Sequence, residues 1–396
     1  MRMGICIATV TLAVLAVIAS GCCCCGGPGS RASPSPVPTA PAPAGLTLRE
    51  SRPFHMGTTP FPYDYSEQAA RETYALAGGH TDLVMQHFDA GVPWPEAYGG
   101  QRFHVSVEAD LDRRVAEKRP GQKMYLSMTP IAFGRDGLAP YLGERDNMER
   151  PGEWKARDFG DPEVAVAYTA FCERLIERLD PDYMAYGIEV NMLAEKNPAA
   201  FDEYVAFCGQ VYPALKARHP DLPVFVTLHI DTYAGDKERQ RQAIARLLPY
   251  TDYIAVSTYP FGAEADPANL PRDWFSQMRD LAPEKTFAVG ETGFPAEDVD
   301  MPSYHAYINA SEEWQAEYVS FLLSSAADLD AEFVVWFVPV DYEGMWKLLE
   351  AQGADELVKL WKDCGLWDGE RKQRQALGVW DAWLALPVRG QPGAMR

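Results

Sequence analysis

Short apolar runs alternate with longer amphipathic stretches along most of the chain after Leu46. The short runs are rich in β-branched and aromatic residues, which favour strands. The longer stretches have apolar residues at spacings of three and four, the helical period, as in Glu163–Leu179, Ala199–Arg218 and Glu312–Leu329. The predicted strands are Phe54–Thr58, Leu83–Phe88, Met124–Met128, Tyr183–Ile188, Val224–Leu228, Tyr253–Ser257, Phe287–Val289 and Phe333–Phe337.

Alternation of strands and helices predicts a parallel sheet, and eight such units predict a single (β/α)8 TIM barrel over residues 46–390. An open doubly wound sheet is the alternative. Such a sheet more often carries a glycine-rich phosphate loop after its first strand, and HMGTTPFPYD at 55–64 contains none. Active sites of barrels lie at the carboxyl ends of the strands, so the residues that end each apolar run are the informative ones.

The first residues predict a secretory signal peptide over 1–21. An apolar stretch from Ile5 to Ala19, too short to span a bilayer, is followed directly by Ser20, Gly21 and Cys22. Small residues before a cysteine resemble a bacterial lipobox, which implies cleavage before Cys22 and lipidation of that residue. An ordinary signal peptide cleaved a few residues away is the alternative.

Residues 22–45 contain a cysteine cluster and then a Pro/Ala/Gly-rich stretch with few large apolar side chains. Prolines favour extended conformations, so this stretch is predicted to be a linker between the anchor and the barrel. The expected location is the bacterial cell envelope, outside the cytoplasm, with the lipid at Cys22 in a membrane. Cys172 and Cys208 lie in successive predicted helices; they could form a disulfide, and buried free thiols are the expected state.

The charge balance narrows the class of partner. The chain has 56 acidic and 36 basic residues, a formal net charge of -20. Such a charge disfavours binding to nucleic acid backbones and fits a neutral substrate better than a polyanion.

Two glutamates stand at the ends of predicted strands. Glu189 closes the fourth strand and Glu291 closes the seventh, and in a closed barrel these two ends face each other across the mouth. Hydrolysis of a glycosidic bond requires two carboxyl groups, one that donates a proton to the leaving oxygen and one that attacks the sugar or stabilises its positive charge. Burial and the neighbouring anion are expected to raise the pKa of Glu189 and so suit it to the acid role.

Four segments resemble glycoside hydrolase clan A, the retaining (β/α)8 glycosidases, and most of all its endo-galactanase family, glycoside hydrolase family 53. They are GETGFP at 290–295, STYPF at 257–261, Trp336, and GLWDGERKQRQALGVWDAWL at 365–384. The resemblance implies that Glu291 is the nucleophile, Glu189 the acid/base, Tyr259 the hydrogen-bond partner of Glu291, and Trp336 the floor of the sugar subsite.

The chain departs from the clan pattern at two places. Clan members usually have asparagine directly before the acid/base glutamate, where this chain has Ile188; Asn191 would lie on the same side as Glu189 if the strand continued. The arginine common near the end of the second strand is also absent, and Gln86, His87 or Asp89 is expected to contact the sugar or the nucleophile instead. His229 and Trp94 complete the predicted carbohydrate-binding residues.

The predicted function is therefore a surface-anchored retaining glycoside hydrolase that acts on a neutral polysaccharide or oligosaccharide and needs no cofactor. One alternative is a catalytically degraded barrel that serves as a carbohydrate-binding lipoprotein, which the Ile188 departure favours. A second is a metal-dependent hydrolase that uses His87, Asp89, His229 and Asp231, although His-x-Asp is a weak spacing signal for a metal site.

Overall fold

The apolar runs form a closed barrel in the computed structural model, which describes residues 49–261 and 266–389. Its strands are hydrogen-bonded in the order β1-β10-β7-β6-β5-β4-β3-β2, and every neighbouring pair is parallel. The predicted (β/α)8 fold is confirmed, and the doubly wound alternative is excluded because the strands close on themselves. The barrel strands are β1 (His55–Thr58), β2 (Leu83–Phe88), β3 (Lys123–Met128), β4 (Tyr183–Gly187), β5 (Val224–His229), β6 (Tyr253–Thr258), β7 (Thr286–Thr292) and β10 (Phe333–Trp336).

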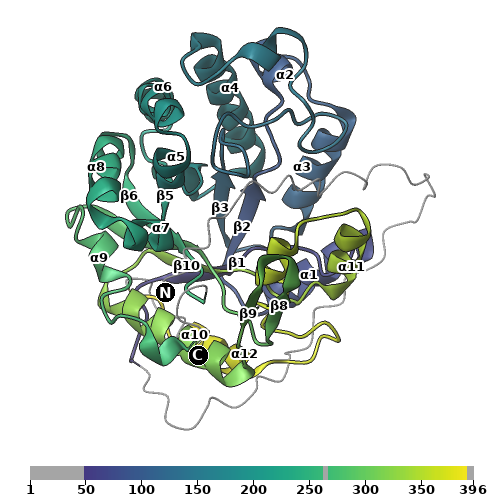
Figure 1. The fold of residues 1–396 in the computed structure, drawn as a ribbon, viewed down its shortest axis with the longest axis vertical. Helices are drawn as coiled ribbons and strands as arrows, with labels where there is room; N and C mark the ends of the chain where they lie inside the picture. The colour runs from purple at the N-terminus through teal and green to yellow at the C-terminus, as the bar shows by residue number, and fades with distance from the viewer. Residues whose placement is uncertain (1–48, 262–265, 390–396) are drawn as a thin grey trace.

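Helices surround the barrel, as Figure 1 shows. The final helix packs along α10, and its Trp383 ring stacks on Phe54 with 5.9 Å between ring centroids. The helices are α1 (Glu67–Gly78), α2 (Trp94–Tyr98), α3 (Val105–Glu117), α4 (Pro162–Leu179), α5 (Asn191–Lys196), α6 (Pro198–Arg218), α7 (Ile230–Gly235), α8 (Lys237–Leu247), α9 (Ser276–Arg279), α10 (Glu312–Asp328), α11 (Glu343–Ala351) and α12 (Gln375–Leu384).

The buried strand residues divide into two layers because successive side chains on a strand point to opposite faces. Inside the barrel, the Tyr125 ring lies 5.7 Å from Phe225 and 4.9 Å from Phe333, centroid to centroid. The alternate residues, such as Met184 and Val334, pack outward against the helices. A shift of one position along a strand therefore decides whether a side chain enters the barrel or faces a helix.

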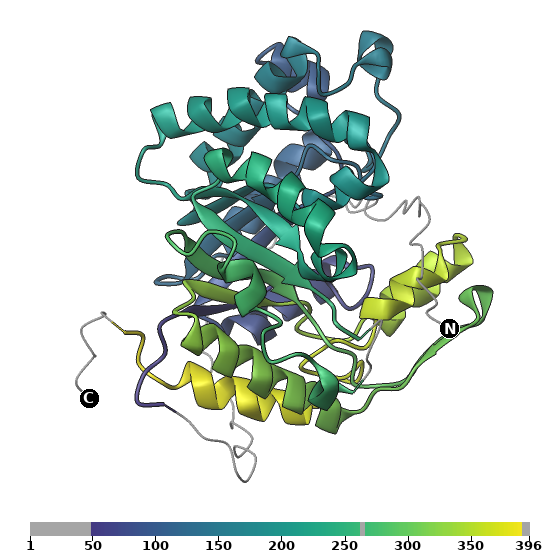
Figure 2. The ribbon, with the colours of Figure 1, turned by 60° about the vertical axis from the view of Figure 1, so that its left-hand side comes forward.

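A short hairpin between β7 and α10 was not predicted. Its strands, β8 (Val299–Met301) and β9 (Ala306–Ile308), pair antiparallel. The 3-10 helix η5 (Glu356–Trp361) packs against β8, and the Glu356 carboxylate accepts a hydrogen bond of 2.8 Å from the backbone N–H of Ser303. Figure 2 shows the hairpin and α11 together on one side of the barrel.

The predicted signal peptide, Cys22 and the linker of residues 22–45 lie outside the described residues. Within residues 49–261 and 266–389, no helix combines the length and apolar character needed to cross a membrane. Cys172 and Cys208 are buried free thiols, so the disulfide considered for them is not formed.

Candidate active site

Glu189 lies just beyond β4, in an unusual backbone conformation. The strand ends at Gly187, and Glu189 has a left-handed φ of 52°. A non-glycine residue held in this region costs about 1–3 kcal/mol, and such residues cluster at functional sites. The turn is held in place because the backbone N–H of Glu189 donates to the Thr227 hydroxyl at 2.8 Å, and that of Val190 donates to the Thr227 carbonyl at 3.0 Å.

Glu291 lies within β7, and its carboxylate is held from two sides. The Tyr259 hydroxyl donates to Oε1 at 2.6 Å, and His87 Nδ1 lies 3.2 Å from Oε2. Tyr259 is itself positioned by Asp231, whose Oδ2 accepts from the Tyr259 backbone N–H at 3.2 Å and from the Thr258 hydroxyl at 2.8 Å. The Glu291 side chain keeps 15% of its surface exposed.

The Glu189 carboxylate is also bonded on both oxygens. The Ser257 hydroxyl donates to Oε1 at 2.7 Å, and Arg135 Nε lies 3.2 Å from Oε2. This side chain is likewise 15% exposed. Ser257 lies in β6, and Arg135 lies in the loop after β3. The groups that bond the Glu189 carboxylate therefore come from residues distant from it in the sequence.

A chain of opposite charges joins the two glutamates. Arg135, which contacts Glu189, also places Nη2 at 2.8 Å from Asp89 Oδ2. Asp89 Oδ2 lies 3.9 Å from His87 Nε2, and the other His87 nitrogen contacts Glu291. From Glu189 to Glu291, the contacts thus alternate between negatively charged carboxylates and the positively charged groups of Arg135 and His87.

The surroundings set the pKa of each group. Burial alone lowers the pKa of His87, but the hydrogen bonds and negative charges of Asp89 and Glu291 outweigh burial and raise it to about 9. Burial raises the pKa of Glu189, but the positive charges of His229 and Arg135 and the hydrogen bond from Ser257 bring it below the ordinary value. The expectation of a raised pKa for Glu189 is thus wrong for the free protein, because the sequence did not reveal these cations.

The raised pKa of His87 predicts a pH-dependent contribution to stability. Because its pKa rises from 6.5 to about 9 on folding, the folded state binds the proton more tightly. The stabilisation is fully present below pH 6.5 and is lost as the pH rises through about 9. In urea unfolding, the difference in unfolding free energy between wild type and His87→Gln should therefore shrink from pH 6 to pH 9. A difference that stays constant over this range contradicts a proton shared by His87, Asp89 and Glu291.

Trp336 does not form the floor of this site. It is completely buried and packs in the outer layer, where its indole N–H donates to the Cys364 carbonyl at 2.8 Å. The next residue, Phe337, is half-buried, and its ring centroid lies 6.5 Å from that of Tyr259. The correction is a shift of one residue, which strand alternation converts into the opposite face.

Substitutions at these two positions should separate their roles in stability. Trp336→Ala is expected to lower the free energy of unfolding by about 3–5 kcal/mol, the usual range for removing a buried large aromatic side chain. Phe337→Ala should lower it by less, because Phe337 is half-buried. Urea unfolding of both variants measures the difference. Equal losses would show that Trp336 is not a core residue.

Two other predicted carbohydrate-binding residues are structural. Asn191 is completely buried at the start of α5, where its Nδ2 donates to the His229 carbonyl at 3.1 Å and its Oδ1 accepts from the His229 N–H at 2.7 Å. It does not share a face with Glu189 because β4 has already ended. Trp94 is buried in α2, stacked on Trp154 with 5.9 Å between ring centroids, rather than placed along a cleft. His229, His87 and Asp89 do surround the glutamates.

The residues proposed for a metal site have other partners. Asp89 is bound by the Arg135 guanidinium, and Asp231 by the backbone of Tyr259, so their oxygens face donors rather than one shared point. Among the described residues, the His, Cys, Asp and Glu side chains that converge within 4.8 Å are Asp341, Glu343 and Asp363.

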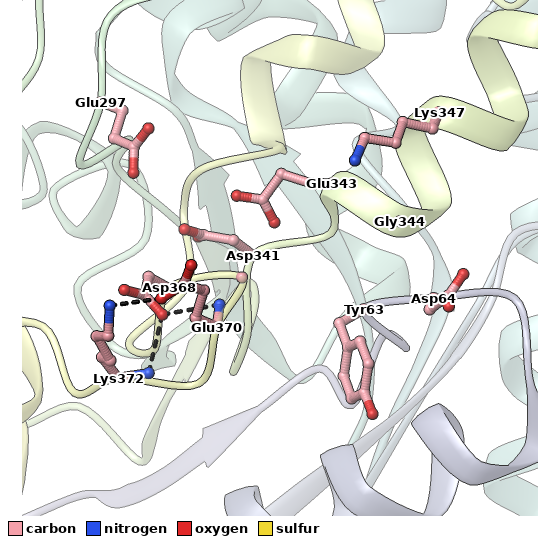
Figure 3. A pocket seen from close by; sticks show the side chains of 11 residues that line it. Tyr63, Asp64, Glu297, Asp341, Glu343, Gly344, Lys347, Asp368, Glu370 and Lys372 are labelled. Carbon is pink, nitrogen blue, oxygen red and sulfur yellow. Dashed lines mark hydrogen bonds and ion pairs between the residues drawn. The ribbon is translucent and has the colours of Figure 1, made fainter.

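Those three acidic residues belong to a different region. Asp341 and Glu343 line a pocket of about 610 Å³ beside α11, together with Lys347 (Figure 3). Asp341 is completely buried and is paired with Arg374, and Asp363 is paired with Lys362. Two of the three carboxylates therefore already have a cationic partner.

Arg135 and Ser257 are the site residues that the sequence did not reveal. Arg135 lies in SMTPIAFGRDG, a loop whose course no periodicity describes. It reaches Glu189 from the loop after β3. Ser257 ends a predicted strand, and position alone could have marked it as a candidate.

No protein-family model matches the chain, and no curated protein matches its sequence. Solved structures do share its barrel. A GH5_18 protein from Streptomyces cattleya, solved with GlcNAc, superposes with a TM-score of 0.59 at 15% identity, over 87% of this chain and 82% of that one. The exo-β-1,4-mannosidase Op5Man5 from Opitutaceae bacterium strain TAV5 has a TM-score of 0.59 at 13% identity, over 87% of this chain and 60% of that one.

The GH53 catalytic domain from Ignisphaera aggregans also matches, with a TM-score of 0.52 at 16% identity, over 89% of this chain and all of that one (100%). At these identities the likeness establishes the fold. The chain therefore has the barrel that its resemblance to clan A implied, the fold also found in these glycoside hydrolases.

Proposed function

We propose that the protein is a retaining glycoside hydrolase that acts on a neutral saccharide through Glu291 and Glu189. The observation that carries this proposal is the pair of glutamates at the ends of β4 and β7, each partly exposed and linked through Arg135, Asp89 and His87. Glu291 accepts a hydrogen bond from the Tyr259 hydroxyl, and its other oxygen lies 3.2 Å from the imidazole of His87; both neighbours suit an ionised nucleophile.

In the proposed reaction, Glu291 attacks the anomeric carbon as the bond to the leaving oxygen breaks, and Glu189 gives its proton to that oxygen. The Glu189 carboxylate then takes a proton from water, whose oxygen displaces Glu291 from the sugar. The Glu189 proton is thereby restored. The Tyr259 hydroxyl orients Glu291 in the first step and hydrogen-bonds the carboxylate that leaves in the second.

The proposal is tested by screening purified protein against 2,4-dinitrophenyl and 4-nitrophenyl β-glycosides and against β-mannan, β-galactan, β-glucan and xylan. One neighbour is named an exo-β-1,4-mannosidase, and another was solved with Manβ1-4GlcNAc; β-mannosides and that disaccharide are therefore tested first. The configuration of the initial product, read by proton NMR, should be retained. An inverted product rejects the double-displacement mechanism, and no turnover of any substrate rejects the enzyme assignment.

A carbohydrate-binding role is the second candidate. It is supported by the lowered pKa of Glu189, which disfavours the protonated form that an acid needs, and by Ile188 in place of asparagine. Calorimetric titration of the same polysaccharides separates the two candidates. Binding of a polysaccharide that wild type does not cleave would favour this role.

We further propose that lipid on Cys22 anchors the protein in the bacterial cell envelope, with the barrel outside the cytoplasm. The sequence ASGC at 19–22 supports this proposal. When the full chain is expressed in a bacterium, wild type should fractionate with membranes and take up labelled palmitate. Cys22→Ser should lose the label and leave the membrane fraction, since the sulfur that accepts the lipid is gone. Retention of label by Cys22→Ser would place the modification elsewhere.

A further inference from the structure

Arg135 is held rigidly at the tip of the loop after β3. It has a left-handed φ of 55°, and its backbone N–H donates to the Ala132 carbonyl at 2.7 Å. Side chains at the end of α5 and the start of α6 hold the same loop from outside: Lys196 Nζ donates to the Gly134 carbonyl at 2.8 Å, and Asn197 Nδ2 to the Asp136 carbonyl at 2.9 Å. The loop thus presents the guanidinium from a fixed support.

The guanidinium is shared unequally between two carboxylates. Nη1 and Nη2 bond the two oxygens of Asp89 at 3.1 and 2.8 Å, whereas Nε alone faces Glu189, at 3.2 Å. The bidentate arrangement with Asp89 is the stronger one. Arg135 can therefore lose its contact with Glu189 and remain docked on Asp89, with two hydrogen bonds intact.

We propose that Arg135 is the positioning residue of Glu189: it remains on Asp89 throughout the reaction, orients the Glu189 carboxylate through Nε in the free protein, and loses that contact when Glu189 takes up its proton. A protonated carboxylic acid no longer attracts the guanidinium as an anion does, so the contact weakens at the moment when the acid must turn toward the leaving oxygen. This inference rests on the proposed function.

The charged and polar groups facing Glu189 come from several elements. Arg135 and His229 favour its ionised form, as does the Ser257 hydroxyl, and Asp89 opposes it. Lys196 and Tyr259 also interact with its charge. Since Arg135 and Asp89 act in opposite directions, removing each should move the proton affinity of Glu189 in opposite directions.

The consequence for the rate follows from the acid role. The first step needs protonated Glu189, so kcat/KM falls as the pH rises through the pKa of Glu189 in the free enzyme. In Arg135→Gln, this fall of kcat/KM, the basic limb of the pH profile, should move to higher pH. In Asp89→Asn it should move to lower pH, because Arg135 then has Glu189 as its remaining carboxylate partner. Arg135→Lys, which retains the charge, should restore the limb most of the way to its wild-type position.

The test measures pH profiles of kcat/KM for these variants on the best dinitrophenyl glycoside. In parallel, carbon-13 NMR titrates the Glu189 carboxyl, assigned with Glu189→Gln. Thermal unfolding confirms that each variant folds. Opposite shifts in Arg135→Gln and Asp89→Asn support the inference. Shifts of the same sign, or a Glu189 titration unchanged by Arg135→Gln, overturn it.

The NMR titration also separates this inference from the proposed function. If wild type cleaves no glycoside, the enzyme assignment fails, yet the titration still shows whether Arg135 controls Glu189. If wild type is active and the titration does not respond to Arg135→Gln, the inference fails while the enzyme assignment stands. If Arg135→Gln does not fold, the Glu189 titration in Asp89→Asn decides the question. A shift of that titration to higher pH overturns the inference.

Discussion

Glu291→Ala is expected to lower kcat by roughly 10⁴- to 10⁶-fold, the scale of loss when an enzyme's nucleophile is removed. The variant has no carboxylate to form the glycosyl-enzyme, while Glu189, Ser257 and Arg135 remain in place. The measurement is the initial rate on the best dinitrophenyl glycoside. Added azide should restore part of the rate, because a small anion can occupy the space left by the carboxylate, and its product should have inverted configuration.

Glu332→Gln is the matched control. Glu332 is also a half-buried barrel glutamate with a tyrosine partner, since its Oε1 accepts from the Tyr183 hydroxyl at 2.7 Å. It lies just before β10, at the opposite end of the barrel from the strand ends that hold Glu291. Near-normal turnover is expected for this variant. Near-normal turnover in Glu291→Ala would remove Glu291 from the mechanism, and equal losses in both variants would indicate a general effect on folding.

Glu189→Ala should slow cleavage of saccharides and of 4-nitrophenyl glycosides by about 10²- to 10⁴-fold, the usual contribution of a general acid or base. Formation of the glycosyl-enzyme from dinitrophenyl glycosides should be affected far less, because dinitrophenolate leaves without protonation. Azide should accelerate turnover here too, since it needs no base, and should yield a glycosyl azide of retained configuration.

The opposite configurations of the azide products distinguish the two glutamates without reference to rate. Glu195→Ala is the control for the second variant, since Glu195 is an exposed carboxylate on α5 only six residues along the chain. It should behave as wild type. Equal slowing of all substrates in Glu189→Ala, whatever their leaving group, would argue that Glu189 is not the acid.

The position of the two glutamates followed from local patterns in the sequence. Each strand is an apolar run that ends abruptly, and the barrel topology dictates that strand ends meet at one face. Glu189, Glu291 and Tyr259 could therefore be assigned to the site before their contacts were known, and the hydrogen bond between Tyr259 and Glu291 agrees with the clan resemblance.

The predictions for individual side chains were wrong where a shift of one residue moves a side chain to the other face of a strand. Trp336 and Phe337 are adjacent, yet one packs against α10 and the other lies near Tyr259. Likewise Asn191 could share a face with Glu189 only if β4 continued, and the left-handed Glu189 ends that alternation. Strand ends cannot be located to one residue from periodicity, because hydrogen bonding to neighbouring strands decides where each one stops.

By itself the sequence determined the eightfold alternation, hence the barrel, and which carboxylates stand at its mouth, because both depend on patterns within a few residues. Only the tertiary structure decided the electrostatics of the site. Arg135, Asp89 and His87 come from different loops and strands, and their charges act over a few ångströms in space while lying up to 48 residues apart in the chain. The pKa of Glu189 likewise depends on His229, Arg135 and Ser257, which come from other loops and strands, and no local pattern in the sequence predicts their approach.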